Sequence, residues 1–224
     1  RPSKHIKSPY VADIEIDGKM YLGHTPSLGC CGLAEAGSYV MVNKTTGTKC
    51  DYRIQHSVKT DDDGSDVTIG IAPKLAEKLI ESALEKNIIE GLDVDEFGRE
   101  KKRLNSRFDF IGKTKENKEF ILEVKNVPLA DYEDIEAKER KKRDYTGWNC
   151  KDKIAYFPDG YRKKKTQTVS ERALKHVNEL TQIKKEHPET RCILMFVIQR
   201  TDVTKFQPSI IDPIYRDAIK EAND

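Results

Sequence analysis

The sequence predicts an α/β (α+β) protein of two domains, a small β-barrel over residues 1–70 and a mixed α/β domain over residues 71–224. The first part of the chain holds only short strand-like segments with Gly-rich turns, whereas strand-like and helix-like apolar patterns alternate in the second. The charge is divided in the same way. Residues 1–72 hold 8 Lys and Arg against 9 Asp and Glu, while residues 97–175 hold 22 against 14, a net charge of +8. Such a basic surface suits phosphate groups, although it also serves solubility.

The composition excludes several classes of protein. Of the 224 residues, 37% are hydrophobic and 35% are charged, which allows a sizeable core under an ionic surface. The longest apolar run is residues 192–198, too short to cross a bilayer, so we expect no membrane span. An odd number of cysteines, at 30, 31, 50, 150 and 192, favours reduced thiols inside a cell, in either the cytoplasm or an organelle matrix. Neither they nor the histidines have zinc-site spacing.

The barrel prediction depends on five alternating segments, which are residues 11–16, 20–24, 39–42, 50–58 and 67–71. Asp17-Gly18 is a hairpin turn signal between the first two. Tyr21, Tyr39 and Tyr52 lie in these strands, where tyrosines usually pack against neighbouring strands.

Helical periodicity and end signals predict three helices in the second domain. The first covers residues 73–89, with Pro73 at its start and Gly91 as its stop. The second covers residues 170–184 and is capped by Ser170, and the third begins at Asp212-Pro213. The run at 192–198 is typical of a strand covered on both faces.

Residues 106–111 and 120–127 predict a β-hairpin, because both are rich in β-branched and aromatic residues and a polar turn separates them. Side chains alternate along a strand, so Glu123 and Lys125 share one face. If Asp109 pairs near Glu123, the two carboxylates form an oxygen-rich pocket.

Such a pocket suits Mg²⁺, or Mn²⁺ in its place, because Mg²⁺ keeps several waters and needs only one or two protein carboxylates. We expect Asp109, Glu123 and the Val124 carbonyl to hold the ion and Lys125 to position an attacking water. An Asp followed at a distance by Glu-x-Lys on a strand is the signature of the PD-(D/E)XK nuclease fold. The alternative is a solvated hairpin face carrying an ordinary ion pair.

The amino-acid sequence around this motif is similar to that of the sugar fermentation stimulation protein family, SfsA. The segments NSRFDF, LEVKNV, YFPD, SERALKHVNEL, ILMFVIQR and IDPIYRDAI occur in that family's order. The resemblance also covers DIEIDGKMYLGHTPSLG near the N-terminus, although Ser27-Leu28 replaces the family's Asn-Thr pair. It therefore implies an OB-fold-like domain over residues 1–70, a PD-(D/E)XK nuclease-like domain over residues 71–224, and DNA binding.

The resemblance also implies supporting residues around the site. Nucleases of this fold often take one more acid from the first helix, where Glu77 and Glu81 are the options and Glu81 lies nearer the apolar stripe. The Glu-Arg-x-x-Lys-His pattern and the Gln-Arg after the apolar strand add Glu171, Lys175, His176, Gln199 and Arg200. For His176, a packed and hydrogen-bonded core histidine is the alternative.

Basic residues near the motif are candidates for phosphate contacts. They are Lys101, Lys102, Arg103, Arg107, Lys163, Lys164 and Lys165. A charged insertion at about residues 128–155 departs from the family and carries the single tryptophan, Trp148. We expect packing of Trp148, a neighbouring molecule in a crystal or a protein partner to order it.

Together these patterns predict a nucleic-acid-binding protein, with DNA favoured over RNA, that hydrolyses phosphodiester bonds with Mg²⁺. The alternative is a non-catalytic DNA-binding regulator or a structural subunit of a nucleoprotein assembly, without a membrane role in either case.

Overall fold

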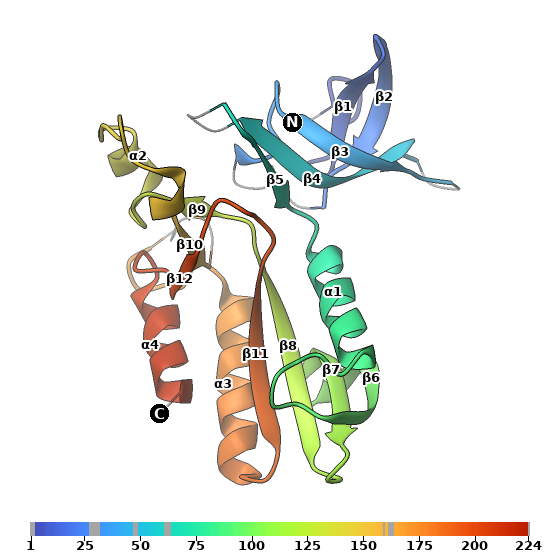
Figure 1. The fold of residues 1–224 in the computed structure, drawn as a ribbon, viewed down its shortest axis with the longest axis vertical. Helices are drawn as coiled ribbons and strands as arrows, with labels where there is room; N and C mark the ends of the chain where they lie inside the picture. The colour runs from blue at the N-terminus through green and yellow to red at the C-terminus, as the bar shows by residue number, and fades with distance from the viewer. Residues whose placement is uncertain are drawn as a thin grey trace.

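The computed structural model describes residues 3–26, 32–46, 49–60, 64–158, 160 and 164–223. Over these residues the chain is a mixed α/β protein with one sheet near the N-terminus and two in the remainder. The N-terminal sheet lies at one end of the molecule (Figure 1). Helix α1 (Pro73–Glu85) leads from this sheet to the second part of the chain.

The N-terminal sheet has five strands, which are β1 (Val11–Ile16), β2 (Lys19–His24), β3 (Tyr39–Lys44), β4 (Tyr52–Thr60) and β5 (Asp66–Gly70). Their order is β1-β2-β4-β3, with β5 added on β4. The predicted barrel is not confirmed, because no pairing among the described strands closes this sheet. Strands β2 and β4 share only two described pairs, Gly23 with Tyr52 and His24 with Arg53. The β1–β2 hairpin is therefore joined to the rest of the sheet over a short length only.

The core of this sheet is a compact apolar cluster that includes Ile14, Ile54 and Ile69. Tyr21 and Tyr52 pack edge to face with a ring separation of 5.3 Å and lie against that cluster. Tyr39 differs from them, since 79% of its surface is exposed.

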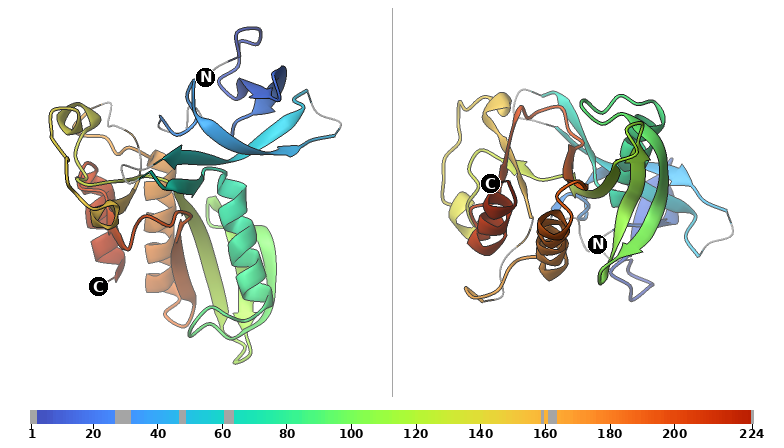
Figure 2. Two further views of the ribbon diagram at one scale, coloured as in Figure 1. Left: turned by 45° about the horizontal axis from the view of Figure 1, so that its top comes forward. Right: turned by 90° about the horizontal axis from the view of Figure 1, so that it is seen from below.

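The central sheet of the second part has the order β11-β8-β7-β6. Its strands are β6 (Val94–Arg103), β7 (Ser106–Thr114), β8 (Glu119–Val127) and β11 (Arg191–Ile198), and only β11 runs parallel to its neighbour, β8. Helix α1 packs on one face through Ala76, Ile80 and Leu84. Helix α3 (Glu171–Glu186) packs on the other face through Leu180 and Ile183 (Figure 2).

A smaller sheet, of order β12-β10-β9, lies beside α3 and α4. It consists of β9 (Ala130–Asp131), β10 (Ile154–Phe157) and β12 (Lys205–Pro208), and α4 (Pro213–Asn223) follows it. The charged insertion runs between β9 and β10 and contains the short helix α2 (Ala137–Arg140) and a 3-10 turn at Cys150–Asp152. Trp148 packs edge to face on Tyr132 and Tyr145, as predicted, yet stays 46% exposed. A protein partner there stays a prediction.

The first helix is shorter than predicted. It ends at Glu85, because Asn87 adopts a positive φ of 50° and its side-chain amide bonds both the N–H and the carbonyl of Val94. These bonds turn the chain directly into β6, a strand that the sequence pattern does not predict. Most of β6 is exposed, so it lacks apolar alternation.

Candidate functional site

Strands β7 and β8 bring Asp109 and Glu123 to neighbouring positions, as the sequence predicts. Their ladder pairs Phe110 with Leu122, and Asp109 with Glu123 would be the next pair in this register. The ladder stops there instead. The Asp109 carboxylate accepts a hydrogen bond from the N–H of Val124, with a donor–acceptor distance of 2.8 Å.

The β6–β7 ladder is interrupted at the same level. It pairs Arg99 with Phe110 and Lys101 with Phe108, and it skips Glu100 and Asp109 between them. Glu100 has a positive φ of 49°, which is strained for a residue with a side chain. Phe110 therefore packs on the α1 side and Phe108 on the α3 side, although residues two apart normally share a face. Asp109 lies at this break in the sheet.

Glu123 is almost completely buried, with 3% of its surface exposed. One of its oxygens, Oε1, accepts a hydrogen bond from Lys125 Nζ at 2.5 Å and also contacts Nδ1 of His176. Burial raises the pKa of Glu123, but hydrogen bonds from His176 and Lys125 outweigh it and leave that pKa below its ordinary value. The other oxygen, Oε2, is buried without a hydrogen-bond partner among the described residues.

Asp109 shows the opposite electrostatic response. Burial, followed by the charge of Glu123, raises the pKa of Asp109 from 3.8 to about 6. Lys125 acts in the other direction but does not compensate. The site therefore holds a charged Glu123 beside an aspartate whose ionisation is less favourable than in the unfolded chain, a combination that an added cation would relieve.

The donor set fits a hard divalent cation. It contains the unpartnered Glu123 Oε2 and the Asp109 carboxylate. The carbonyl of a strand residue points to the same edge as its N–H, so the Val124 carbonyl faces β7 and Asp109. In the described part of the chain, no group of three or more His, Cys, Asp or Glu side chains could hold a metal. An ion here would need water ligands, as Mg²⁺ does.

The two candidate acids of the first helix, Glu77 and Glu81, differ in their contacts, and the choice of Glu81 stays a prediction. Glu81 forms an ion pair with Arg99 at 2.7 Å. Glu77 pairs with Lys74 and Arg99, and its charge contributes to raising the pKa of Asp109. Both acids lie on the same face of the helix, so sequence spacing could not decide between them.

The predicted polar residues of helix α3 differ in burial and in the groups that they contact. His176 is buried against Glu123, whereas Glu171 is exposed in the first turn. Lys175 donates to the carbonyl of Asn105 at 2.8 Å and lies 3.7 Å from Glu179. Lys175 thus ties α3 to the turn between β6 and β7.

Gln199 and Arg200 lie outside this arrangement. Arg200 makes two hydrogen bonds of 2.6 Å to Asp202 and one to the Pro128 carbonyl, all in a buried setting. Gln199 contacts Asn126 and Gly70, where the N-terminal sheet meets β8. No described contact joins either residue to Asp109 or Glu123.

Several basic residues of the β6–β7 hairpin lie close to Asp109 in the strand ladder. Lys101, Lys102 and Arg107 are exposed, and Lys102 stands opposite Arg107 in the ladder. Arg107 lies 3.8 Å from Glu100, and Arg103 lies 3.6 Å from Glu119, so each carries a weak ion pair. Lys164 and Lys165 are exposed in the segment before α3, and Lys163 lies outside the described residues.

One further buried polar side chain, on α4, was not predicted. Tyr215 of α4 is fully buried, and its hydroxyl has no hydrogen-bond partner among the described residues. Burial, followed by the charge of Glu123, raises the pKa of Tyr215. Tyr215 lies in the segment IDPIYRDAI, which resembles the family sequence and could have indicated this residue as well as the start of a helix.

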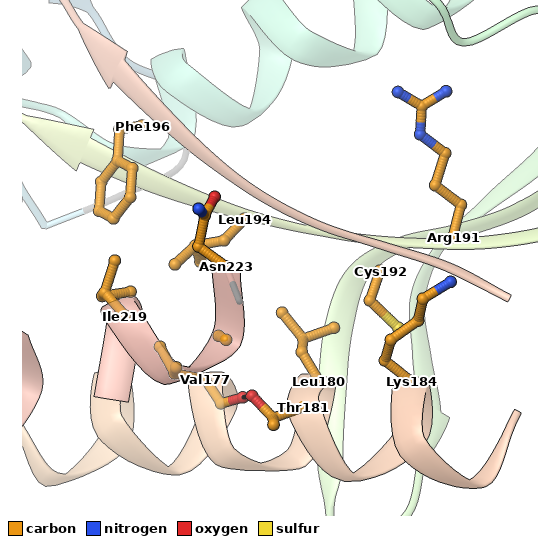
Figure 3. A pocket seen from close by; sticks show the side chains of 11 residues that line it. Val177, Leu180, Thr181, Lys184, Arg191, Cys192, Leu194, Phe196, Ile219 and Asn223 are labelled. Carbon is orange, nitrogen blue, oxygen red and sulfur yellow. Dashed lines mark hydrogen bonds between the residues drawn. The ribbon is translucent and has the colours of Figure 1, made fainter. Parts of the chain in front are cut away.

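A cavity of about 420 Å³ lies between α3, β11 and α4 (Figure 3). Apolar side chains such as Leu180, Leu194 and Ile219 form most of its wall, and Lys184 and Arg191 lie toward one end. Because neither Asp109 nor Glu123 lines it, this cavity is separate from the carboxylate site.

Within the described ranges, no helix has the length and apolar character needed to cross a bilayer.

Comparison with known proteins gives consistent results over nearly the whole chain. Residues 74–138 and 144–224 match the family model described as "Sugar fermentation stimulation protein RE domain". The "Sugar fermentation stimulation protein homolog" of Prochlorococcus marinus (strain MIT 9515) is 28% identical over 232 residues, covering 96% of this chain and 80% of the relative. The homolog of Clostridium perfringens (strain 13 / Type A) is 29% identical over 218 residues, covering 95% and 80%.

A solved structure is also similar to this fold. It is described as "The structure of Pyrococcus Furiosus SfsA in complex with Ca2+" and superposes with a TM-score of 0.70 at 20% identity. The match covers 97% of this chain and 80% of the other. At this identity the likeness concerns the fold alone.

Proposed function

The chain belongs to the sugar fermentation stimulation protein family, and from this we propose that it binds nucleic acid and hydrolyses phosphodiester bonds with a divalent cation held at Asp109 and Glu123. The observation that carries the proposal is the bare, buried Oε2 of Glu123 beside an aspartate whose pKa is raised to about 6. The Pyrococcus relative is described in complex with Ca²⁺, an ion that takes oxygen ligands, which is the ligand type that Asp109 and Glu123 offer here.

The proposal gives each side chain a separate task. Asp109, Glu123 and the Val124 carbonyl would hold Mg²⁺ or Mn²⁺. When bound, such an ion supplies Lewis-acid polarisation of a phosphoryl oxygen and a more acidic water. Lys125 brings an ammonium group to the same pocket, where it would orient the water and offset negative charge on the phosphate. Glu77 would add negative charge from α1.

The expected ligand is a nucleic acid, because the exposed cations of the β6–β7 hairpin stand next to Asp109 in the sheet. Lys101, Lys102 and Arg107 would contact phosphates and carry no sequence information. The PD-(D/E)XK-like arrangement belongs to the same proposal, with α1 and α3 on opposite faces of the sheet that carries Asp109 and Glu123. We favour DNA over RNA on the family resemblance.

Cleavage assays test the proposal directly. Labelled double-stranded DNA, single-stranded DNA and RNA would be incubated with Mg²⁺ or Mn²⁺ and with a chelator. Glu123→Gln and Lys125→Ala should each lower the rate by about 10²-fold or more. Lys118→Ala is the matched control, since Lys118 is an exposed lysine paired with Glu116 in the same hairpin. Cleavage that persists in both site variants would remove the proposal.

A second candidate is a non-catalytic nucleic-acid-binding regulator or subunit. The contact that favours it is the short hydrogen bond from Lys125 to Glu123, because the ammonium group can neutralise that carboxylate without a metal ion. Binding to DNA that is unchanged by a chelator, with no cleavage of any substrate, would select this candidate.

A further inference from the structure

His176 is buried in the middle of the site rather than facing the approach of a substrate. Only 3% of its surface is exposed, and its Nδ1 contacts Oε1 of Glu123. A phosphate in a solvent-exposed groove could not reach such a ring without displacing its neighbours. A direct phosphate contact therefore does not fit this position.

The ring of His176 is held in place by the elements around it. Its neighbours on α3, Ala173 and Val177, are buried in the apolar cluster shared with α4. Ser170 caps the helix by accepting a hydrogen bond from the N–H of Ala173 at 3.2 Å. The ring of Phe108 lies 5.6 Å from the imidazole, centroid to centroid. The imidazole is thus a rigid partner for Glu123.

The two oxygens of Glu123 are used unequally. Oε1 contacts both Lys125 Nζ and His176 Nδ1, while Oε2 has no partner among the described residues. Lys125 is a poor anchor for a carboxylate, because its long side chain has rotamer freedom and its ammonium is needed elsewhere during the proposed reaction. If Lys125 turned to a water or a phosphate, His176 alone would still hold Oε1.

We propose that His176 is a positioning residue that fixes the Glu123 carboxylate, so that Oε2 stays directed to a divalent cation while Lys125 is released to act on the substrate. The proposal rests on the proposed function and deepens it. It assigns the α3 histidine to the metal ligand rather than to nucleic acid, in keeping with the general use of hydrogen bonds to orient ligating carboxylates.

Cation affinity in the absence of nucleic acid provides the test. Binding of Mn²⁺ alone would be measured by electron paramagnetic resonance and calorimetry on the whole chain. His176→Phe removes the bond to Glu123 and should weaken Mn²⁺ binding by about 10–100-fold. His176→Asn keeps a side-chain N–H donor and should recover part of that loss. His187→Phe is the control, because His187 is 47% exposed at the C-terminal end of the same helix.

The outcomes separate this inference from the function that it rests on. If His176→Phe is folded by circular dichroism and binds Mn²⁺ within about twofold of the wild type, while Glu123→Gln does not bind it, the positioning role is wrong and the cation site stands. If the wild type binds no Mn²⁺, or Glu123→Gln binds it equally well, the proposed function itself fails. Should His176→Phe not fold, His176→Leu gives the same comparison with a smaller side chain.

Discussion

Asp109 illustrates the cost of placing two carboxylates at a break in a sheet. Its ordinary pKa of 3.8 is raised to about 6 by burial and by the charge of Glu123, so the folded chain disfavours the ionised form. A shift of this size corresponds to at most about 3 kcal/mol. Solvent screening of a partly exposed group reduces it to about 1–2 kcal/mol.

Asp109→Asn should therefore stabilise the protein at neutral pH by about 1–2 kcal/mol while abolishing the proposed activity. The wild type loses stability as the pH rises from about 4, the unfolded pKa, to about 6, the folded one. The variant does not titrate, so its advantage should be complete above about pH 6 and absent below about pH 4. Urea unfolding at several pH values measures it.

The control for this prediction is Asp95→Asn, which removes an exposed carboxylate from β6. It should leave the free energy of unfolding unchanged within about 0.5 kcal/mol at every pH. A stability gain for Asp109→Asn that is the same at pH 4 and pH 8 would show that the charge of Asp109 is not the cause.

Arg200 gives a contrasting prediction, because its contacts indicate a structural role. It forms a buried ion pair with Asp202, whose pKa burial raises but Arg200 lowers below its ordinary value. Arg200→Ala would leave that carboxylate buried with Lys153 as its remaining ion-pair partner among the described residues, so we expect a loss of about 3–5 kcal/mol. Unfolding in urea and cleavage per folded molecule would be measured together. A loss of cleavage with unchanged stability would return Arg200 to the site.

At the scale of single residues, the sequence predicted which side chains lie together at the candidate site, but not the hydrogen bonds that they make. Alternation along one strand was enough to place Glu123 and Lys125 on a common face. The choice between Glu77 and Glu81 depends on where α1 crosses β7, which no local pattern contains. The contact between His176 and Glu123 joins residues 53 positions apart, so only the packed fold reveals it.

At the scale of elements, the close approach of β6 and β7 depends on a glycine. A Cβ at Gly112 would collide with the backbone carbonyl of Glu96 and lie 2.7 Å from the ring of Phe120. At Gly98 on the neighbouring strand, a Cβ would meet only the flexible side chain of Lys101. The two positions therefore form a matched pair.

Gly112→Ala should lower the free energy of unfolding by about 1–3 kcal/mol, because the backbone of Glu96 cannot move aside without breaking the sheet. Gly98→Ala should change it by less than about 0.5 kcal/mol, since Lys101 can choose another rotamer. Chemical denaturation of both variants checks the difference. Equal effects would mean that β6 is free to shift.

Local end signals explain which elements were predicted well. Ser170 caps α3 one residue before Glu171, the predicted place, because its hydroxyl satisfies an N–H of the first turn. Strand β6 was missed because only Val94 among its residues is buried, which leaves no period-2 apolar pattern to read.

At the scale of the whole molecule, the sequence showed that β-structure precedes α/β structure but not how the N-terminal strands close. Alternation identifies strands and says nothing about their partners. The parallel pairing of β2 with β4 covers two residues only and depends on contacts far apart in sequence. An open sheet and a barrel therefore produce the same local alternation of apolar residues, so the sequence could not distinguish between them.

The N-terminal sheet is tied to the candidate site through a closed set of hydrogen bonds at Gly70. Its N–H donates to the Gln199 carbonyl at 2.8 Å, and its carbonyl accepts from the Asn126 side chain at 3.0 Å. Gln199 in turn donates to the Asn126 side chain at 2.7 Å. Asn126 directly follows Lys125, so the orientation of the sheet is set next to the proposed site.

Asn126→Ala removes two of these bonds and should speed amide exchange at Gly70 about fivefold, equivalent to about 1 kcal/mol, the net value of one hydrogen bond. Gln199→Ala should have a smaller effect, and the double variant should be no worse than Asn126→Ala, because both changes break the same bond. Hydrogen exchange by NMR measures all three, with the Val124 amide, bonded to Asp109, as the internal reference. If the two effects add, or if the Gly70 amide exchanges at the wild-type rate throughout, these bonds do not couple the sheet to the strand that carries Lys125.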